Sequence, residues 1–170
     1  MNNKAVYAGS FDPVTYGHLW VIEKSANMYD QVIIAIGNNP DKRYMFSIHE
    51  RMTMLQDTTK HLDNVIVEAF SDEFLVNYAK RKQANFLIRG IRNNIDYEYE
   101  RTMRYINSDL NPDITSIFLM PPRKYAEISS SLIKGLIQFN EWETALKKYL
   151  PEASFNSLTN YIAHKNNNDK

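Results

Sequence analysis

KAVYAGSFDPVTYGHLWVI, residues 4–22, is the stretch that decides how this chain folds. Its first six residues are short, apolar and typical of a β-strand, and from Leu19 onward apolar residues follow a helical spacing. Between them lie a proline, Gly17, His18 and several hydroxyl groups. In an open α/β sheet, ligands bind at the carboxyl ends of strands, beside such strand–helix junctions. An ordinary turn explains this composition equally well, so the rest of the chain must distinguish the two interpretations.

The remainder of the chain alternates continuous apolar runs with helical patterns. We expect strands at residues 4–9, 31–37, 64–70, 85–90 and 114–120, and helices at residues 17–28, 47–58, 72–82 and 95–110. Ser47 and Glu50 have the spacing of a capping box at a helix start. Strands that alternate with helices predict a parallel sheet covered on both faces. We therefore predict an α/β, Rossmann-like, doubly wound five-stranded parallel sheet followed by C-terminal helices from Ser129, at 142–150 and at 153–163.

Length and composition restrict the class of protein. We expect one domain over residues 1–163 and a polar, frayed tail over residues 164–170. Lys plus Arg and Asp plus Glu number 20 each, so no global field favours nucleic acid or an anionic membrane as a partner. The chain has no cysteine, which excludes disulfides, thiolate zinc sites and cysteine nucleophiles. With no signal-peptide pattern and no apolar run of about 18 residues, we expect a soluble, cytoplasmic protein.

Positively charged side chains follow the predicted strands at their carboxyl ends. Lys42 and Arg43 come after the second strand, Arg89 and Arg92 after the fourth, and the serines of residues 129–131 after the fifth. All of these segments open on one edge of a doubly wound sheet. A lone loop cation is usually solvated, but cations gathered beside a helix N-terminus suggest a polyphosphate ligand.

Several familiar site motifs are missing from the sequence. The five glycines form neither GxGxxG nor GxxxxGK[ST], which argues against an ordinary dinucleotide dehydrogenase and a P-loop enzyme. HExxH, an EF-hand loop and GxSxG are absent as well. His49, His61 and His164 have no partners at metal-ligand spacing, and we interpret them as surface residues.

At two places the chain resembles the nucleotidylyltransferase superfamily. TYGH at residues 15–18 matches the T/HxGH signature, and ISSS at residues 128–131 with Lys134 resembles the ISSTxxR signature. Within that superfamily the chain is similar to the bacterial phosphopantetheine adenylyltransferase family. That likeness extends from about Lys4 to Leu150 and is carried by YAGSFDPVTYGH (7–18), LIRGIR (87–92), DYEYE (96–100) and FLMP (118–121).

This resemblance implies reversible transfer of the adenylyl group of ATP to 4′-phosphopantetheine, giving dephospho-coenzyme A and pyrophosphate in coenzyme A biosynthesis. The attacking phosphate is already an anion, so positioning and charge stabilisation can carry the catalysis. Mg²⁺ is expected on the ATP phosphates, with no dedicated protein ligands. The resemblance also implies a homohexamer.

By the same resemblance, His18, Lys42 and Ser10 are catalytic. His18 donates to the α-phosphate, Lys42 bridges the attacking phosphate and the α-phosphate, and Ser10 holds a phosphate. The implied substrate ligands are Ser10, Lys42, Leu75 and Arg89. The implied ATP ligands are Ser10, Phe11, His18, Gly90, Ile91, Arg92, Glu100, Tyr125, Ala126, Glu127, Ile128, Ser129, Ser130 and Ser131.

A few residues depart from the family pattern or have another explanation. Lys134 stands in place of the superfamily arginine and keeps its charge without the bidentate fork, so we assign it no role. We interpret Asp12 as a turn-forming residue beside Pro13. Residues 71–75 are more acidic than the glycine-containing segment that the resemblance would give.

Two alternatives remain open at this point. The acceptor could be nicotinamide mononucleotide or glycerol 3-phosphate, although Lys42 and residues 89–92 resemble the pantetheine enzyme in particular. A non-catalytic nucleotide-binding regulator on the same scaffold would bind ATP without releasing pyrophosphate.

Overall fold

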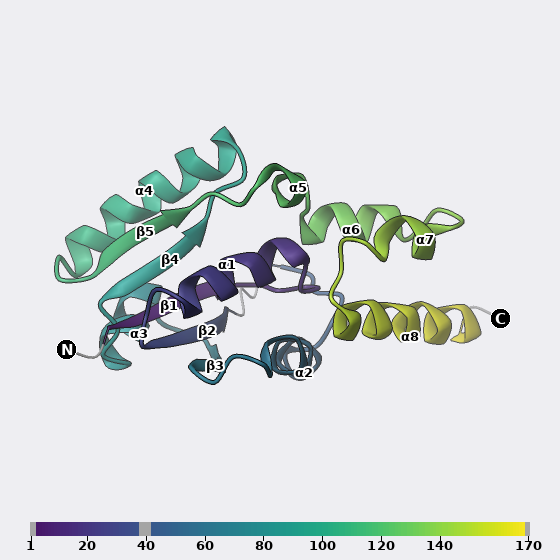
Figure 1. The fold of residues 1–170 in the computed structure, drawn as a ribbon, viewed down its shortest axis with the longest axis horizontal. Helices are drawn as coiled ribbons and strands as arrows, with labels where there is room; N and C mark the ends of the chain where they lie inside the picture. The colour runs from purple at the N-terminus through teal and green to yellow at the C-terminus, as the bar shows by residue number, and fades with distance from the viewer. Residues whose placement is uncertain (1–2, 38–41, 169–170) are drawn as a thin grey trace.

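The fold is a parallel five-stranded sheet with helices on both faces (Figure 1). This computed structural model describes residues 3–37 and 42–168. The strands are β1 (Lys4–Gly9), β2 (Gln31–Gly37), β3 (Val65–Phe70), β4 (Phe86–Gly90) and β5 (Thr115–Leu119). The helices are α1 (Tyr16–Ala26), α2 (Ile48–Thr59), α3 (Leu75–Arg81), α4 (Asn94–Leu110), α5 (Arg123–Ala126), α6 (Ser130–Leu136), α7 (Trp142–Leu146) and α8 (Glu152–Asn168). The predicted fold class is confirmed.

The strand order creates a crevice beside β1. The order is β3-β2-β1-β4-β5. The chain adds β2 and β3 on one side of β1, and then returns to add β4 and β5 on the other side. Tyr7 pairs with Ile34 of β2 and with Ile88 of β4 in parallel register. The loops that leave the carboxyl ends of β1 and β4 turn to opposite faces, and such a switch point is where open α/β sheets bind ligands.

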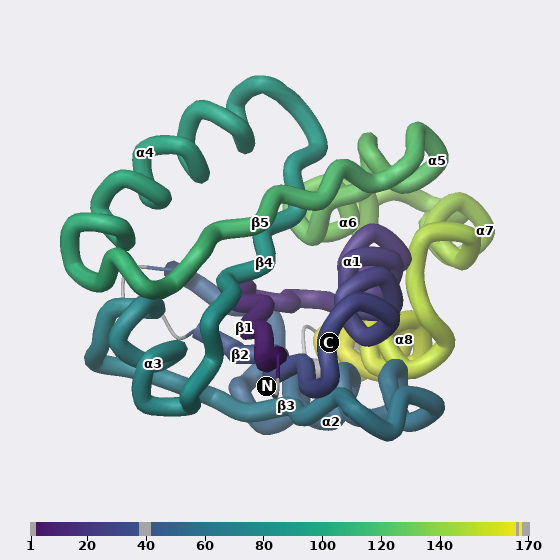
Figure 2. The backbone as a smooth tube through the Cα atoms, turned by 60° about the vertical axis from the view of Figure 1, so that its left-hand side comes forward, coloured from purple at the N-terminus to yellow at the C-terminus, as the bar shows by residue number. Residues whose placement is uncertain are grey.

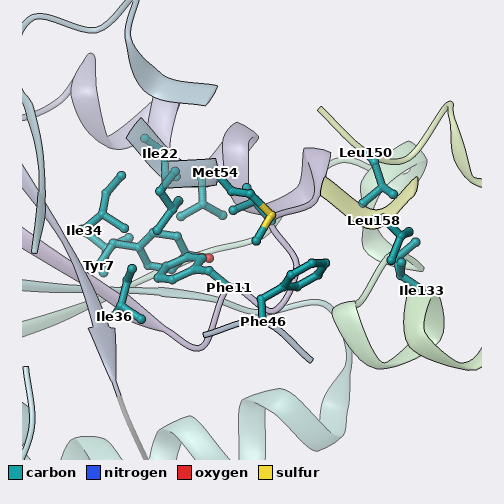
Figure 3. Packing of buried hydrophobic residues seen from close by; sticks show 14 of the residues in the cluster. Tyr7, Phe11, Ile22, Ile34, Ile36, Phe46, Met54, Ile133, Leu150 and Leu158 are labelled. Carbon is teal, nitrogen blue, oxygen red and sulfur yellow. The ribbon is translucent and has the colours of Figure 1, made fainter. Parts of the chain in front are cut away.

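Two apolar clusters hold the helices to the sheet. On one face, Tyr7 and Ile34 belong to one buried apolar cluster with Ile22 of α1 and Met54 of α2, and the cluster continues to Leu158 of α8 at its far end (Figure 3). On the other face, the alternate strand residues pack against α3, which contributes Val76, Tyr78 and Ala79. Figure 2 shows the same division, with α3 and α4 on one side of the sheet and α1, α2 and α8 on the other. The strands are therefore apolar on both faces, as continuous runs predict.

α4 differs from the other long helices because it buries little apolar surface. Of its residues only Glu100 is buried, while Ile95 and Tyr99 are 81% and 61% exposed. Figure 1 shows α4 alongside β4 and β5, at the edge of the sheet.

Most predicted boundaries agree with the structure to within two residues, and the capping box of Ser47 and Glu50 forms as predicted. The helix predicted from residue 72 begins instead at Leu75, because Asp72 adopts a left-handed φ of 62° that no helix continues. The helix predicted at residues 142–150 ends instead at Leu146. The last helix extends five residues past its predicted end, to Asn168, so much of the segment that we expected to be a frayed tail is helical. Residues 38–41 of the predicted turn and the last two residues of the predicted tail lie outside the described part of the chain.

None of the helices in the described ranges is long and apolar enough to cross a bilayer.

Candidate active site

The carboxyl ends of β1 and β4 open into a cavity of about 410 Å³. Its walls come from the turn after β1, the loop before α2, the end of β4 and the start of α6. A second cavity of about 300 Å³ adjoins it, with Ser10, Tyr44, Arg89 and Glu100 in the shared wall. These are the four strand-end segments that the sequence predicts to meet at one edge.

Most of the predicted site residues line the larger cavity, and a few lie elsewhere. Those in its wall are Ser10, Phe11, His18, Lys42, Arg89, Gly90, Arg92, Glu100, Ile128, Ser129, Ser130 and Ser131. Leu75 lines the second cavity together with Phe74 and Tyr99. Ile91 is buried in the fold, where its N–H donates to the Leu119 carbonyl (2.9 Å). Tyr125 lines a separate shallow cavity with Tyr16, and Ala126 and Glu127 line none of the three.

The turn after β1 is shaped around Phe11. This residue adopts a left-handed φ of 51° and is 1% exposed. A left-handed φ is uncommon for a bulky residue and is held here by packing, since the ring contacts both Tyr7 (5.5 Å between centroids) and His18 (5.1 Å) edge-on. A Cβ at Gly9 would lie 3.0 Å from the Phe11 ring, so glycine is the residue that lets the ring fold back under the turn.

Hydrogen bonds fix the protonation of His18. Thr15 caps α1, and its backbone N–H donates to His18 Nδ1 (3.1 Å). Because Nδ1 accepts, the proton of the neutral ring sits on Nε2, for which the described residues provide no hydrogen-bond partner. Burial, reinforced by the positive charge of Arg92, lowers the His18 pKa from 6.5 to about 4. At neutral pH the residue is therefore an uncharged N–H donor in the cavity wall.

Three cations of the cavity are each held by a carboxylate. Arg89 makes a two-pronged ion pair with Glu100, one contact being Nε to Oε2 at 2.7 Å, and its Nη1 also donates to the Ala8 carbonyl (2.9 Å). Arg92 pairs in the same way with Asp96, through Nε at 2.8 Å and Nη2 at 3.1 Å. These pairs fix the guanidinium planes and leave two N–H donors of Arg89 unused among the described residues.

The third pair shows that our interpretation of Asp12 as a turn-former is incomplete. Asp12 is 1% exposed and accepts from the backbone N–H groups of Met45 (3.0 Å) and Phe46 (2.9 Å). Lys134 Nζ donates to Asp12 Oδ2 (2.9 Å), the oxygen that also accepts from the Met45 N–H. Asp12 therefore connects the β1 turn to the loop before α2 and to α6. Its backbone partners lie more than 30 residues away in sequence, so no local pattern could have revealed them.

Lys42 and Arg43 differ from the other cations of the cavity. Both are exposed, and within residues 3–37 and 42–168 neither forms a hydrogen bond or ion pair. Their ammonium and guanidinium groups thus remain available to a ligand.

The serines of residues 129–131 line the cavity, and two of them also form hydrogen bonds within the fold. Ser129 caps α6 by accepting from the Leu132 N–H (3.0 Å), and the Ser130 hydroxyl donates to the Pro13 carbonyl (2.8 Å). The neighbouring loop lies close to α1, because a Cβ at Gly17 would be 3.5 Å from the Tyr125 carbonyl. The cap was predicted from sequence, whereas the tie from Ser130 to the β1 turn was not.

No group of three or more His, Asp or Glu side chains placed to hold a metal ion occurs within the described ranges.

Comparison with known proteins agrees with this geometry. A cytidylyltransferase-like family model matches residues 6–136. Phosphopantetheine adenylyltransferase from Chromobacterium violaceum is 54% identical over 155 residues, which cover 91% of this chain and 94% of that protein. The chain belongs to the phosphopantetheine adenylyltransferase family. The family member from Neisseria meningitidis serogroup B is 50% identical over 163 residues, or 96% of each chain, and that from Caldanaerobacter subterraneus is 46% identical over 148 residues, or 87% of this chain and 90% of that protein.

Solved structures support the fold of this family member. Nicotinic acid mononucleotide adenylyltransferase from Plasmodium falciparum, complexed with NaAD, superposes with a TM-score of 0.69 at 18% identity. The likeness covers 98% of this chain and 97% of that one. At this identity the superposition bears on the fold alone. Together, the comparisons make this family member a nucleotidyltransferase with a Rossmann-like fold.

Proposed function

We propose that this nucleotidyltransferase transfers the adenylyl group of ATP to 4′-phosphopantetheine, reversibly, in coenzyme A biosynthesis. A phosphate oxygen of 4′-phosphopantetheine attacks the α-phosphorus of ATP in line. The bond from that phosphorus to the bridging oxygen of the β-phosphate breaks, and pyrophosphate leaves as dephospho-coenzyme A forms.

The observation that carries this proposal is the gathering of an uncharged donor and five cations around one cavity. His18, Lys42, Arg43, Arg89, Arg92 and Lys134 all lie in its wall. Phosphoryl-type transfer from an anionic nucleophile needs positioning and stabilisation of charge on the equatorial oxygens more than it needs a base. The depressed pKa of His18 also suits a hydrogen-bond donor better than a group that exchanges protons at neutral pH.

His18 Nε2–H is the group that we place on the α-phosphate. The Thr15 N–H and the Phe11 ring hold the imidazole before any ligand arrives. A donor that needs no reorganisation stabilises the charge that develops in the transition state most effectively. The proposed ATP site consists of residues that line the larger cavity, namely Ser10, Phe11, Gly90, Arg92, Glu100 and residues 128–131.

The acceptor is proposed to lie toward the second cavity. Lys42 and Arg89 supply the cationic end for its phosphate, and Ser10 lies in the wall between the two cavities. Beyond them the wall of the second cavity includes Phe74, Leu75 and Met103, which suit the apolar part of the pantetheine arm. Because this second cavity adds about 300 Å³ to the site beyond its cationic end, the site favours a long acceptor such as pantetheine over the compact glycerol 3-phosphate.

Mg²⁺ is proposed to arrive with the ATP phosphates and to neutralise part of their charge. It retains several waters and binds through substrate phosphates in many such sites. Asp12 is already engaged by two backbone N–H groups and Lys134, so we do not assign it as a magnesium ligand.

We also propose that the protein is a cytoplasmic homohexamer. The hexamer rests on the resemblance to the family, and the exposed apolar side chains of α4 supply a contact surface for it. Ile95, Tyr97, Tyr99, Tyr105, Ile106 and Leu110 are between 41% and 81% exposed. An apolar surface of this kind on a water-exposed helix is typical of an interface.

The test of the reaction is pyrophosphate release from ATP and Mg²⁺ with 4′-phosphopantetheine, nicotinamide mononucleotide or glycerol 3-phosphate. Release with phosphopantetheine alone supports the proposal. Release with another acceptor would reassign the substrate, and ATP binding without release would indicate a nucleotide-binding regulator.

A further inference from the structure

Arg51 is a buried cation that the proposed reaction does not use. It lies on α2, is 1% exposed and is among the largest fully buried side chains. Burying a guanidinium is costly unless a carboxylate pairs with it. In the described part of the chain no carboxylate does so, and Arg51 Nε has no hydrogen-bond partner. A buried guanidinium without a carboxylate partner lowers the stability of the fold, so its position suggests a functional role.

The contacts that Arg51 does make are both with the cavity wall. Its Nη1 donates to the Ser10 carbonyl (2.9 Å), and its guanidinium carbon lies 4.0 Å from the Tyr44 ring centroid. That carbonyl immediately precedes Phe11, whose left-handed backbone forms the turn. Ser10 and Tyr44 line both cavities.

These contacts join two segments that must act together. Ser10 belongs to the turn after β1, whereas Tyr44 belongs to the loop that carries Lys42. Asp12 forms a second connection between the same segments through the Met45 and Phe46 N–H groups. A misplacement of about 1 Å between groups that hold reacting phosphates can lower the rate by about 10².

We propose that Arg51 is a positioning residue for adenylyl transfer. It fixes the Ser10 carbonyl and the Tyr44 ring, and so sets the distance between Ser10 and Lys42. Its charge, unpaired by any carboxylate of the described residues, also lies behind the cavity and favours anions there, because low-dielectric surroundings screen it weakly. This inference rests on the proposed function for its reaction, while its effect on anion affinity is independent of it.

Three variants separate positioning from a merely structural role. Arg51→Met keeps an apolar chain and removes the charge and the donors, and Arg51→Lys keeps the charge without the planar fork. Met54→Ala is the matched control, since Met54 is equally buried on the same helix but contributes nothing to either cavity wall. Urea unfolding ranks the three variants by stability, and pyrophosphate release gives kcat and KM for each substrate.

We expect Arg51→Met to lower kcat by about 10- to 100-fold under conditions where it is fully folded. Met54→Ala should lose stability and keep its kcat. Arg51→Lys should retain more of its affinity for inorganic pyrophosphate, measured by calorimetry, than of its kcat. If Arg51→Met fails to fold, the proposal is tested by Arg51→Lys alone, through the comparison of its loss of kcat with its loss of pyrophosphate affinity.

A folded Arg51→Met protein with wild-type kcat, or an Arg51→Lys protein that loses kcat and affinity in equal measure, would overturn the proposal. If the wild-type protein releases no pyrophosphate with any acceptor, the proposed function fails instead. The calorimetric arm then still tests Arg51, because inorganic pyrophosphate should bind more weakly to Arg51→Met than to Met54→Ala, and equal binding would contradict it.

Discussion

His18 shows how a single residue acquires its role from its neighbours. The Thr15 N–H determines which ring nitrogen carries the proton, and burial beside Arg92 keeps the ring uncharged. A charged imidazolium would lose its hydrogen bond from Thr15, because a protonated Nδ1 cannot accept. The T/HxGH signature thus encodes a fixed donor as well as a position at the start of α1.

The depressed pKa of His18 predicts how stability depends on pH. The unfolded chain takes up a proton near the ordinary value of 6.5, whereas the folded chain does so only near about 4. The contribution of neutral His18 is therefore fully present above about pH 6.5 and is lost as the pH falls toward 4. Urea unfolding across this range should show a steeper loss in the wild type than in His18→Gln, and equal slopes would contradict the assignment.

Lys42 is expected to act on substrate affinity and on rate together. Its removal in Lys42→Ala deletes a charge-assisted contact to phosphate, which corresponds to about a 10- to 100-fold loss in kcat/KM for phosphopantetheine. Lys60→Ala, at the exposed C-terminal end of α2, is the matched control. If Lys42→Ala altered only the melting temperature, Lys42 would be an ordinary surface residue.

Hydrogen bonds and an ion pair between separate secondary-structure elements position the residues of the site. Asp12 connects the β1 turn with the loop before α2 and with α6, and Ser130 returns from α6 to the Pro13 carbonyl. Each tie spans more than 30 residues of sequence. These hydrogen bonds therefore hold the β1 turn, the loop before α2 and the start of α6 in fixed positions relative to one another.

The Asp12 tie predicts a loss of stability on removal of its charge. Asp12→Asn leaves Lys134 without a counter-ion and can offer only one oxygen to the Met45 and Phe46 N–H groups. We expect a decrease of about 1–3 kcal/mol in the free energy of unfolding, measured by urea titration. Asp113→Asn, at an exposed position, should change it little, and an equal effect of both substitutions would argue against the tie.

The same elements show what the sequence could and could not predict. Strand ends were readable because apolar runs stop at Gly9, Gly37 and Gly90, and the Ser47 cap was readable because its partner is three residues away. The start of α3 was misjudged because a left-handed Asp72 leaves no sequence signal of its own. Asp12 and Arg51 were missed because their partners meet only after the sheet has assembled.

At the scale of the whole molecule, the balance of charge conceals a local concentration of cations. The chain has no net charge, yet five cations line one cavity and three of them are paired with carboxylates. Those carboxylates orient the arginines and limit the mutual repulsion of the cations before a ligand arrives. On α4, by contrast, it is apolar side chains such as Ile95 and Tyr99 that are exposed to water.

The exposed side of α4 predicts the state of assembly. Tyr105→Glu places a charge in the proposed contact surface and should shift the proposed hexamer to a smaller species in sedimentation or light scattering. Phe139→Glu, which alters an exposed aromatic residue beyond α6, serves as the control. A wild-type protein that is already monomeric, or a Tyr105→Glu hexamer, would show that the interface lies elsewhere or does not form.

The most direct test of the account is turnover of His18→Ala compared with its affinity for ATP. If the imidazole stabilises charge on the α-phosphate in the transition state, pyrophosphate release with phosphopantetheine should fall by about 10² or more, while ATP binding by calorimetry stays near the wild-type value. A purified, folded His18→Ala protein with near wild-type turnover would contradict the role that the geometry suggests for this turn.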